Sequence, residues 1–189
     1  MANVVLFHHA YGPTTGVHHF AEQLREVGHE VTVPDLFEGQ VFATLEEGLG
    51  YAKRVGFDTI IERGRVSAQD QTEASVFAGF SLGVLPAQLL AQTRPGARGA
   101  LLFSGCVSPS EFSDAWPASV PVQIHGMAAD EFFEEDLESA RQLISSVPDA
   151  ELFLYEGSTH LFADNSLDDY NAVATAQLLD RVRGFLASL

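Results

Sequence analysis

The stretch from Ala74 to Val84 constrains the fold of this chain more than any other part of the sequence. It begins as an apolar run, breaks at Gly79-Phe80-Ser81-Leu82-Gly83, and continues with a helical pattern. This pattern predicts a buried strand, a sharp turn and a helix, with Ser81 at the tip of the turn in a strained backbone conformation. Glycines at 79 and 83 suit such a turn, because a Cβ at either position would collide with the backbone beside it. Glycine and serine are common, so the motif gains meaning only from the rest of the chain.

Apolar runs alternate with helical patterns along the whole sequence. Runs that predict strands lie at 4–7, 31–33, 74–80, 99–104, 120–125 and 151–155. Apolar residues at helical spacing predict helices at about 16–27, 82–92, 137–147 and 167–186, with a weaker signal around 45–52. Six strands that alternate with helices predict an α/β fold, in which a mainly parallel sheet is wrapped by helices on both faces.

Two segments bear on domain organisation. The connection at 108–117 is too short to hold an inserted cap domain, and no linker divides the chain, so we expect one domain over residues 1–189. The segment 58–70 leaves three alternatives open, namely a helix, a loop or part of a substrate rim.

The charge balance limits the partners of this chain. It has 26 acidic and 10 basic residues and a net charge of -16, which argues against a nucleic-acid partner because phosphates would be repelled. The apolar run at 4–7 follows no basic residue and is too short for a signal peptide or a membrane span. Cys106 is the only cysteine and is expected to be buried. These features predict a cytoplasmic protein that does not bind membranes, and leave both a monomer and a homodimer open.

Asp130 and His160 follow the fifth and sixth predicted strands. Because ligands of parallel sheets bind at the carboxyl ends of the strands, both side chains are expected near Ser81. The order Ser81, Asp130, His160 is the order of nucleophile, acid and base in α/β-hydrolases. A neutral imidazole suits His160 to take the serine proton, and a buried carboxylate fixes its tautomer. Glu131 is the alternative candidate for the acid. Asp130 is preferred because it comes first after the strand and its shorter side chain suits a fixed geometry.

The tetrahedral intermediate of acyl transfer needs two backbone N–H donors. Leu82, at the start of the predicted helix after the serine, is expected to supply one. The second should come from the loop after the first strand, where Ala10 is the candidate.

The sequence resembles the dienelactone hydrolase family of α/β-hydrolases over nearly its whole length. The resemblance rests on the motifs Val-Val-Leu-Phe-His-His-Ala-Tyr-Gly at 4–12, Val-Pro-Asp-Leu-Phe at 33–37, Gly-Phe-Ser-Leu-Gly at 79–83, His125-Gly126 leading to Asp130, and Tyr-Glu-Gly-Ser-Thr-His-Leu-Phe-Ala-Asp at 155–164. It implies hydrolysis of esters or lactones through an acyl-enzyme, with no metal or organic cofactor. It also implies that the chain starts at what is usually the third strand of the full fold.

Three positions depart from the pattern of that family. Ser81 stands where dienelactone hydrolases carry a cysteine nucleophile, and His9 stands where they carry a glutamate that handles the thiol proton. Asp164 stands where they carry an arginine that grips the substrate carboxylate. The resemblance with these changes implies ordinary serine-esterase chemistry without specificity for dienelactone.

Side chains near the predicted site are candidates for substrate binding, with core packing as the alternative. His9 is expected to donate a hydrogen bond to substrate, and apolar walls are expected from Tyr11, Phe80, Met127 and Phe162. The histidines at 8, 9, 18 and 19 are not expected to bind a metal, because neighbouring side chains on a strand end or a helix point in different directions.

Taken together, these patterns predict a cofactor-free serine hydrolase that cleaves a small ester, lactone or thioester. Two alternatives stay open: a non-catalytic binding protein on the same fold, and an acyltransferase with the same triad. A hydrogen bond between Ser81 and a His160 held by Asp130 is the geometry that favours an enzyme over a binding protein.

Overall fold

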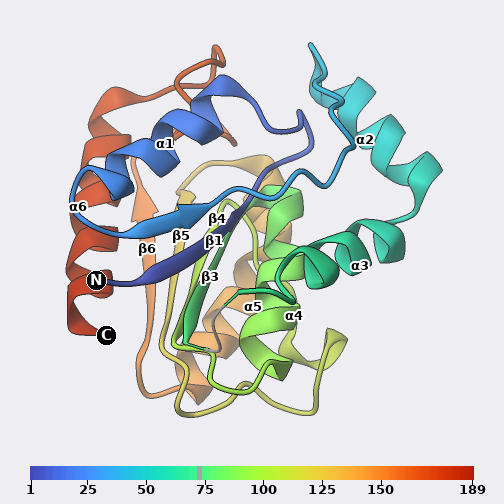
Figure 1. The fold of residues 1–189 in the computed structure, drawn as a ribbon. Coiled ribbons are helices and arrows are strands. Elements are labelled where there is room, and N and C mark those ends of the chain that lie inside the picture. The colour runs from blue at the N-terminus through green and yellow to red at the C-terminus, as the bar shows by residue number, and fades with distance from the viewer. Residues whose placement is uncertain (72–73) are drawn as a thin grey trace.

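The computed structural model describes residues 1–71 and 74–189, and its centre is a six-stranded sheet in which every pair of neighbouring strands is parallel (Figure 1). The strands lie in the spatial order β2-β1-β3-β4-β5-β6. The strand order reverses between β1 and β3, which makes the carboxyl ends of these two strands the expected ligand site. The bounds of the strands are β1 (Asn3–Phe7), β2 (Glu30–Thr32), β3 (Ser75–Phe80), β4 (Gly99–Phe103), β5 (Val122–Met127) and β6 (Ala150–Tyr155).

Helices cover both faces of the sheet, as Figure 1 shows. Helices α1 and α6 lie on one face, and α2 to α5 lie on the other. Their bounds are α1 (Thr15–Arg25), α2 (Leu45–Val55), α3 (Phe57–Ser67), α4 (Val84–Thr93), α5 (Glu131–Ser146) and α6 (Ala172–Ser188), with short 3-10 helices at η1 (Ser81–Gly83) and η2 (Pro109–Glu111). The predicted α/β fold is confirmed.

The apolar core has two parts, one on each face of the sheet. Alternate residues of β1 point to opposite faces, so Val4 and Leu6 pack with α1 and α6, whereas Val5 and Phe7 pack with the helices of the other face. All six residues of β3 are buried, as expected for a central strand that is covered on both sides.

Polar caps decide where several helices begin. The Thr14 hydroxyl accepts a hydrogen bond from the Val17 N–H at the start of α1, and the Thr44 hydroxyl accepts one from the Glu47 N–H at the start of α2. Such caps satisfy backbone donors that have no partner within the helix.

Several boundaries differ from the sequence prediction. The open segment 58–70 lies mostly in α3, which Gly56 separates from α2 by adopting a φ of 93°. Helix α5 starts at Glu131, well before 137, because the Asp130 side chain caps it. The last helix starts at Ala172 and not at 167, because Asn171 caps it through a hydrogen bond from the Ala174 N–H.

The acidic residues at 134–136 had hidden the first turns of α5 in the sequence pattern. Strand β5 also continues through Gly126 and Met127, two residues beyond the predicted end at 125. Among the described residues, no helix is long and apolar enough to cross a membrane.

Candidate active site

Ser81 sits in a sharp turn between β3 and α4. Its φ is 49°, in the left-handed region that residues with a Cβ seldom adopt. A Cβ on Gly79 would lie 2.1 Å from the Gly83 oxygen, and one on Gly83 would lie 2.4 Å from the Phe7 oxygen. Both contacts are too short, so the turn requires glycine at both places. The backbone holds Ser81 in the strained conformation that the motif predicts.

Ser81, His160 and Asp130 form a continuous line of hydrogen bonds. His160 Nε2 lies 2.8 Å from the Ser81 Oγ, and His160 Nδ1 lies 2.7 Å from the Asp130 Oδ2. Because an ionised carboxylate only accepts hydrogen bonds, Nδ1 carries the ring proton and Nε2 is left to accept the proton of the serine hydroxyl. The structure therefore brings the three predicted residues together, with the serine hydroxyl at a histidine that a carboxylate holds.

Asp130 is fixed on both sides of its carboxyl group. Its Oδ1 accepts a hydrogen bond of 3.0 Å from the Phe132 N–H at the start of α5, where the helix dipole favours negative charge. The side chain is almost completely buried. Glu131, the alternative candidate, is exposed in the first turn of α5, and the His160 Nδ1 is hydrogen-bonded to Asp130. The geometry thus favours Asp130 over Glu131 as the partner of the histidine.

Ser104 is a site residue that the sequence analysis missed. It follows β4 with a φ of 52°, and its Oγ–H donates a hydrogen bond of 2.5 Å to the backbone oxygen of His160. The buried hydroxyl therefore anchors the loop that carries the histidine. The only signal in the sequence is a serine followed by a glycine at a strand end, which is too common to single out.

The two candidate oxyanion donors lie on segments that touch. Leu82 belongs to η1, directly after Ser81. The end of β1, which leads to Ala10, lies against this turn, since a Cβ on Gly83 would also approach the His8 oxygen to 2.7 Å. Ala10 is fully buried under α2, where a Cβ on Gly48 would lie 1.8 Å from the Ala10 oxygen. The approach of α2 therefore holds the Ala10 segment in place.

His9 does not line the site. It is fully buried, its Nε2–H donates a hydrogen bond of 2.7 Å to the Asp164 Oδ2, and its Nδ1 accepts one of 3.3 Å from the Tyr11 N–H. The expectation that His9 contacts substrate is wrong for this structure, because both ring nitrogens are used within the protein. His9 directly precedes Ala10 in the chain, so its hydrogen bonds instead hold the segment that carries a candidate oxyanion donor.

Asp164 is the centre of this second buried network. Its Oδ2 also accepts a hydrogen bond of 2.5 Å from the Thr14 hydroxyl, and Ser166 donates to its Oδ1. Burial by itself would raise the pKa of Asp164, but the hydrogen bonds from His9, Ser166 and Thr14 outweigh it and lower the pKa to about 2. The Asp164 carboxylate is therefore used in hydrogen bonds that hold the fold together.

The adjacent His8 has a structural environment as well. Its Nε2 accepts a hydrogen bond from the Leu36 N–H at 2.9 Å, and its Nδ1–H donates to the His9 oxygen at 2.8 Å. Burial lowers the pKa of His8 to about 4. His8 and His9 thus turn to different partners. Within residues 1–71 and 74–189, no three metal-ligating side chains gather in one place.

A cavity of about 370 Å³ opens at Ser81 and His160. Its apolar wall comes from α2, α3, α4 and the start of α5, through the residues Leu45, Leu49, Phe57, Leu85 and Phe132. Phe80, Met127 and Phe162 are core residues, and Tyr11 lies outside the lining. These four are therefore not brought to the cavity as expected. Leu45 and Leu49 belong to the weak helical pattern at 45–52, whereas Phe57 and Phe132 lie at helix starts that the sequence pattern did not predict.

Cys106 also lines this cavity but is buried, as expected, and burial raises the pKa of its thiol to about 12. A thiol of this kind is a poor nucleophile. Of Ser81 and Cys106, Ser81 is therefore the better candidate for a nucleophile in this cavity.

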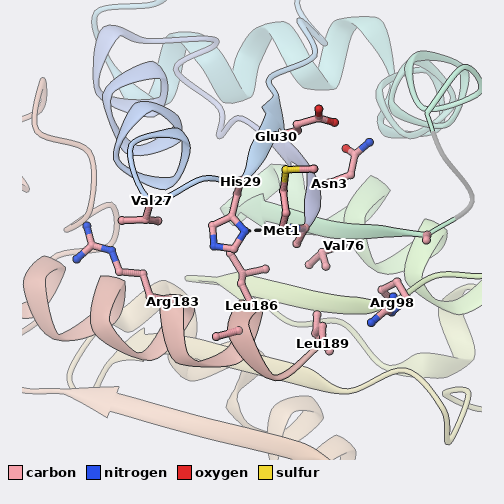
Figure 2. A pocket seen from close by; sticks show the side chains of 13 residues that line it. Met1, Asn3, Val27, His29, Glu30, Val76, Arg98, Arg183, Leu186 and Leu189 are labelled. Carbon is pink, nitrogen blue, oxygen red and sulfur yellow. Dashed lines mark hydrogen bonds between the residues drawn. The ribbon is translucent and has the colours of Figure 1, made fainter.

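A larger cavity, of about 840 Å³, lies at the opposite end of the sheet, between the first strands and the end of α6 (Figure 2). Apolar side chains such as Val76 and Leu186 surround it, and Arg98 and Arg183 lie on opposite sides. His29 accepts a hydrogen bond from the Ala2 N–H there at 3.2 Å. None of the triad residues reaches this cavity, so its size does not mark the catalytic site.

Solved structures with similar folds are numerous, although their sequences are distant. A dienelactone hydrolase-like promiscuous phosphotriesterase from metagenomic libraries is 19% identical, with a TM-score of 0.75 over 100% of this chain and 87% of that one. Esterase 2 of Thermogutta terrifontis is 17% identical, with a TM-score of 0.65 over 99% and 83%. The thioesterase domain from the curacin biosynthetic pathway is 12% identical, with a TM-score of 0.63 over 94% and 90%. At these identities the likeness shows the fold.

No curated protein matches the sequence significantly. The profile of the dienelactone hydrolase family, in contrast, matches residues 1–189. Together with the parallel sheet and its serine turn, this match over the full length shows that the chain belongs to the dienelactone hydrolase family of α/β-hydrolases.

Proposed function

We propose that this protein is a serine esterase that hydrolyses a small ester, lactone or thioester through an acyl-enzyme. The observation that carries the proposal is the position of His160, which bonds Ser81 at 2.8 Å on one side and Asp130 at 2.7 Å on the other. The family supports an ester hydrolase, and two of the similar structures are named as an esterase and a thioesterase.

The first half of the reaction forms the acyl-enzyme. The Ser81 Oγ attacks the substrate carbonyl carbon while His160 Nε2 takes the hydroxyl proton. The backbone N–H groups of Leu82 and Ala10 stabilise the oxyanion that develops on the carbonyl oxygen. When the intermediate collapses, the bond to the leaving alcohol or thiol breaks, and the leaving group receives the proton from His160.

The second half releases the acid. Water attacks the acyl carbon, His160 takes a proton from this water, and the Ser81 oxygen leaves with that proton. Asp130 keeps the imidazole in the correct tautomer and stabilises its positive form in both halves. Apart from substrate and water, the groups used in these steps are side-chain and backbone groups of the chain.

A direct test is covalent labelling together with turnover. Wild-type protein should react with a fluorophosphonate at Ser81 and hydrolyse a short-chain aryl ester, whereas Ser81→Ala should do neither. His160→Ala should reduce kcat by about a thousandfold or more. Wild-type protein that neither labels nor hydrolyses any short acyl ester would leave the non-catalytic binding protein as the better explanation.

The acyltransferase alternative uses the same first half-reaction. It would be favoured if the acyl-enzyme transferred its group to an added alcohol or amine in preference to water. Measuring the ratio of acid to transfer product across acceptor concentrations separates these two enzymes.

A further inference from the structure

The cavity at the triad continues into a second one of about 490 Å³. The two cavities share five lining residues, which are Phe57, Leu85, Cys106, Val107 and Asp136. They therefore form one groove, which we call the acyl groove, from Ser81 past Asp136 to the rim formed by Asp58 and Glu111. A substrate whose carbonyl lies at Ser81 can extend along this groove.

The charged groups along the acyl groove are of one sign. Glu135 and Asp136 line its first part, and Asp58, Glu111 and again Asp136 line its second part. Neither part is lined by an arginine or lysine, and among the described residues none of these four carboxylates forms an ion pair with a basic side chain.

An acidic protein has many solvated carboxylates, but Asp136 differs from these. It is partly buried between the two cavities, and the Cys106 N–H donates a hydrogen bond of 3.0 Å to its Oδ2. Burial raises the pKa of Asp136 and outweighs the opposite effects of the Cys106 N–H and His160, while the charges of Glu135 and Asp130 add to the rise. A cation placed beside this carboxylate would relieve the cost of that burial.

Aromatic rings accompany the carboxylates. Phe57 lies in both parts of the groove, Phe132 lies beside the triad with its ring 5.1 Å from that of His160, and Phe112 lies in the second part. The faces of aromatic rings attract organic cations, and quaternary ammonium groups are recognised in this way. Carboxylates and aromatic rings along one groove are thus the groups that suit an ammonium ion attached to an apolar chain.

We propose that the acyl groove selects esters that carry a positively charged ammonium group and discriminates against esters that carry an anion, with Asp136 as the residue that determines this specificity. The inference rests on the proposed esterase function and narrows its substrate class. The proposed substrate is positively charged. A negatively charged substrate would need a basic side chain, and among the residues that the structure describes no arginine or lysine lines the groove.

The test compares aryl esters whose acyl chains have equal length and end in a trimethylammonium group, a tert-butyl group or a sulfonate. We expect kcat/KM for the ammonium ester to exceed that of its neutral isostere by about tenfold, and the sulfonate ester to fall below the isostere by a similar factor. The preference should shrink as salt is added. Butyrylthiocholine and its neutral tert-butyl analogue repeat the comparison with the charge on the leaving group, and show which half of the substrate occupies the groove.

Asp136→Asn removes the charge but keeps an oxygen that can accept the Cys106 N–H. It should lower the ratio of ammonium to neutral kcat/KM to about threefold or less. Glu138→Gln is the matched control, because it removes the same charge from an exposed position of α5 outside the groove. Asp58→Asn and Glu111→Gln test the far part of the groove, in case Asp136→Asn does not fold.

Equal kcat/KM for the three wild-type substrates would overturn the inference, as would an equal fall of the ratio in Glu138→Gln and Asp136→Asn. Binding of hexyltrimethylammonium, measured by calorimetry against hexanesulfonate, gives a readout without turnover. Ammonium binding that weakens in Asp136→Asn would support the groove assignment even if no ester is hydrolysed, in which case only the proposed function fails. If no ester is hydrolysed, absence of ammonium binding would overturn the assignment.

Discussion

Ser104 and His160 are 56 positions apart in the sequence, and the Ser104 hydroxyl donates a hydrogen bond to the His160 backbone oxygen at 2.5 Å. This contact joins the end of β4 to the loop after β6, and β5 lies between these two strands in the sheet. The base of the proposed triad is therefore held by its own backbone as well as by Asp130.

Ser104→Ala should impair both stability and turnover. Loss of a buried hydrogen bond that leaves a carbonyl without a partner costs about 1–3 kcal/mol of unfolding free energy. We expect kcat for a short aryl ester to fall by about tenfold, because the loop that carries His160 loses its anchor and can shift, which misplaces the imidazole. Urea denaturation and steady-state kinetics measure the two effects, with Ser110→Ala as the exposed control. Wild-type stability and kcat in Ser104→Ala would show that the contact does not position His160.

Asp130→Asn should reduce kcat by about four orders of magnitude while the protein stays folded, because an amide no longer fixes the tautomer of His160. Glu131→Gln, one residue further along the chain, should change kcat by less than about twofold, since its side chain is exposed. Both variants are measured by kcat on the same aryl ester, and the reverse result would make Glu131 the acid.

Asp164→Asn should make the fold less stable at neutral pH. The pKa of Asp164 is lowered to about 2 in the folded protein from an ordinary value of 3.8, so its stabilising effect is fully present above pH 4 and disappears as the pH falls toward 2. We expect a loss of about 2 kcal/mol at pH 7 that vanishes near pH 2. Urea denaturation across this range measures it, with the exposed Asp168→Asn as control. A difference independent of pH would mean that the charge of Asp164 does not carry the effect.

Two buried histidines should make the protein sensitive to mild acid. Burial lowers the pKa of His8 to about 4 and that of His125 to about 3, whereas the unfolded chain titrates near 6.5. The unfolded state therefore binds more protons below pH 6.5, and these two residues should together reduce the unfolding free energy by about 2–3 kcal/mol for each pH unit that the pH falls near pH 5.

His125→Gln removes one of these titrations while keeping a polar group for the Tyr155 hydroxyl, which lies 2.8 Å from the His125 Nδ1. The slope of stability against pH, measured near pH 5, should fall by about half that amount. His19→Gln, exposed on α1, should leave the slope as it is. An unchanged slope in His125→Gln would contradict the role of burial.

The central part of the fold could be predicted from local sequence because its signals are local. The apolar run of β3 predicts the strand, and the glycines around Ser81 predict the turn. Asp130 and His160 could be found because each follows a predicted strand. Tertiary contacts decided the rest. His9 was expected to face substrate, but the partner that holds it is Asp164, 155 positions away.

The walls of the substrate cavity were the least predictable feature. Phe80 and Met127 border the triad in sequence yet point into the core, whereas Leu45, Phe57 and Phe132 reach the cavity from helices whose patterns were weak or misplaced. Which face a helix presents to a cavity depends on its packing against its neighbours, and no local pattern records this packing.

Gly48 links substrate fit to catalysis through a single helix. Its lack of a side chain lets α2 rest on the Ala10 carbonyl, and the same helix contributes Leu45 and Leu49 to the cavity wall. A change that pushes α2 outward to admit a bulkier acyl group would also release the segment that carries Ala10. Variants with a broader substrate range are thus expected to arise by trimming the side chains of α2 or by altering α3, with the backbone of α2 left where it is.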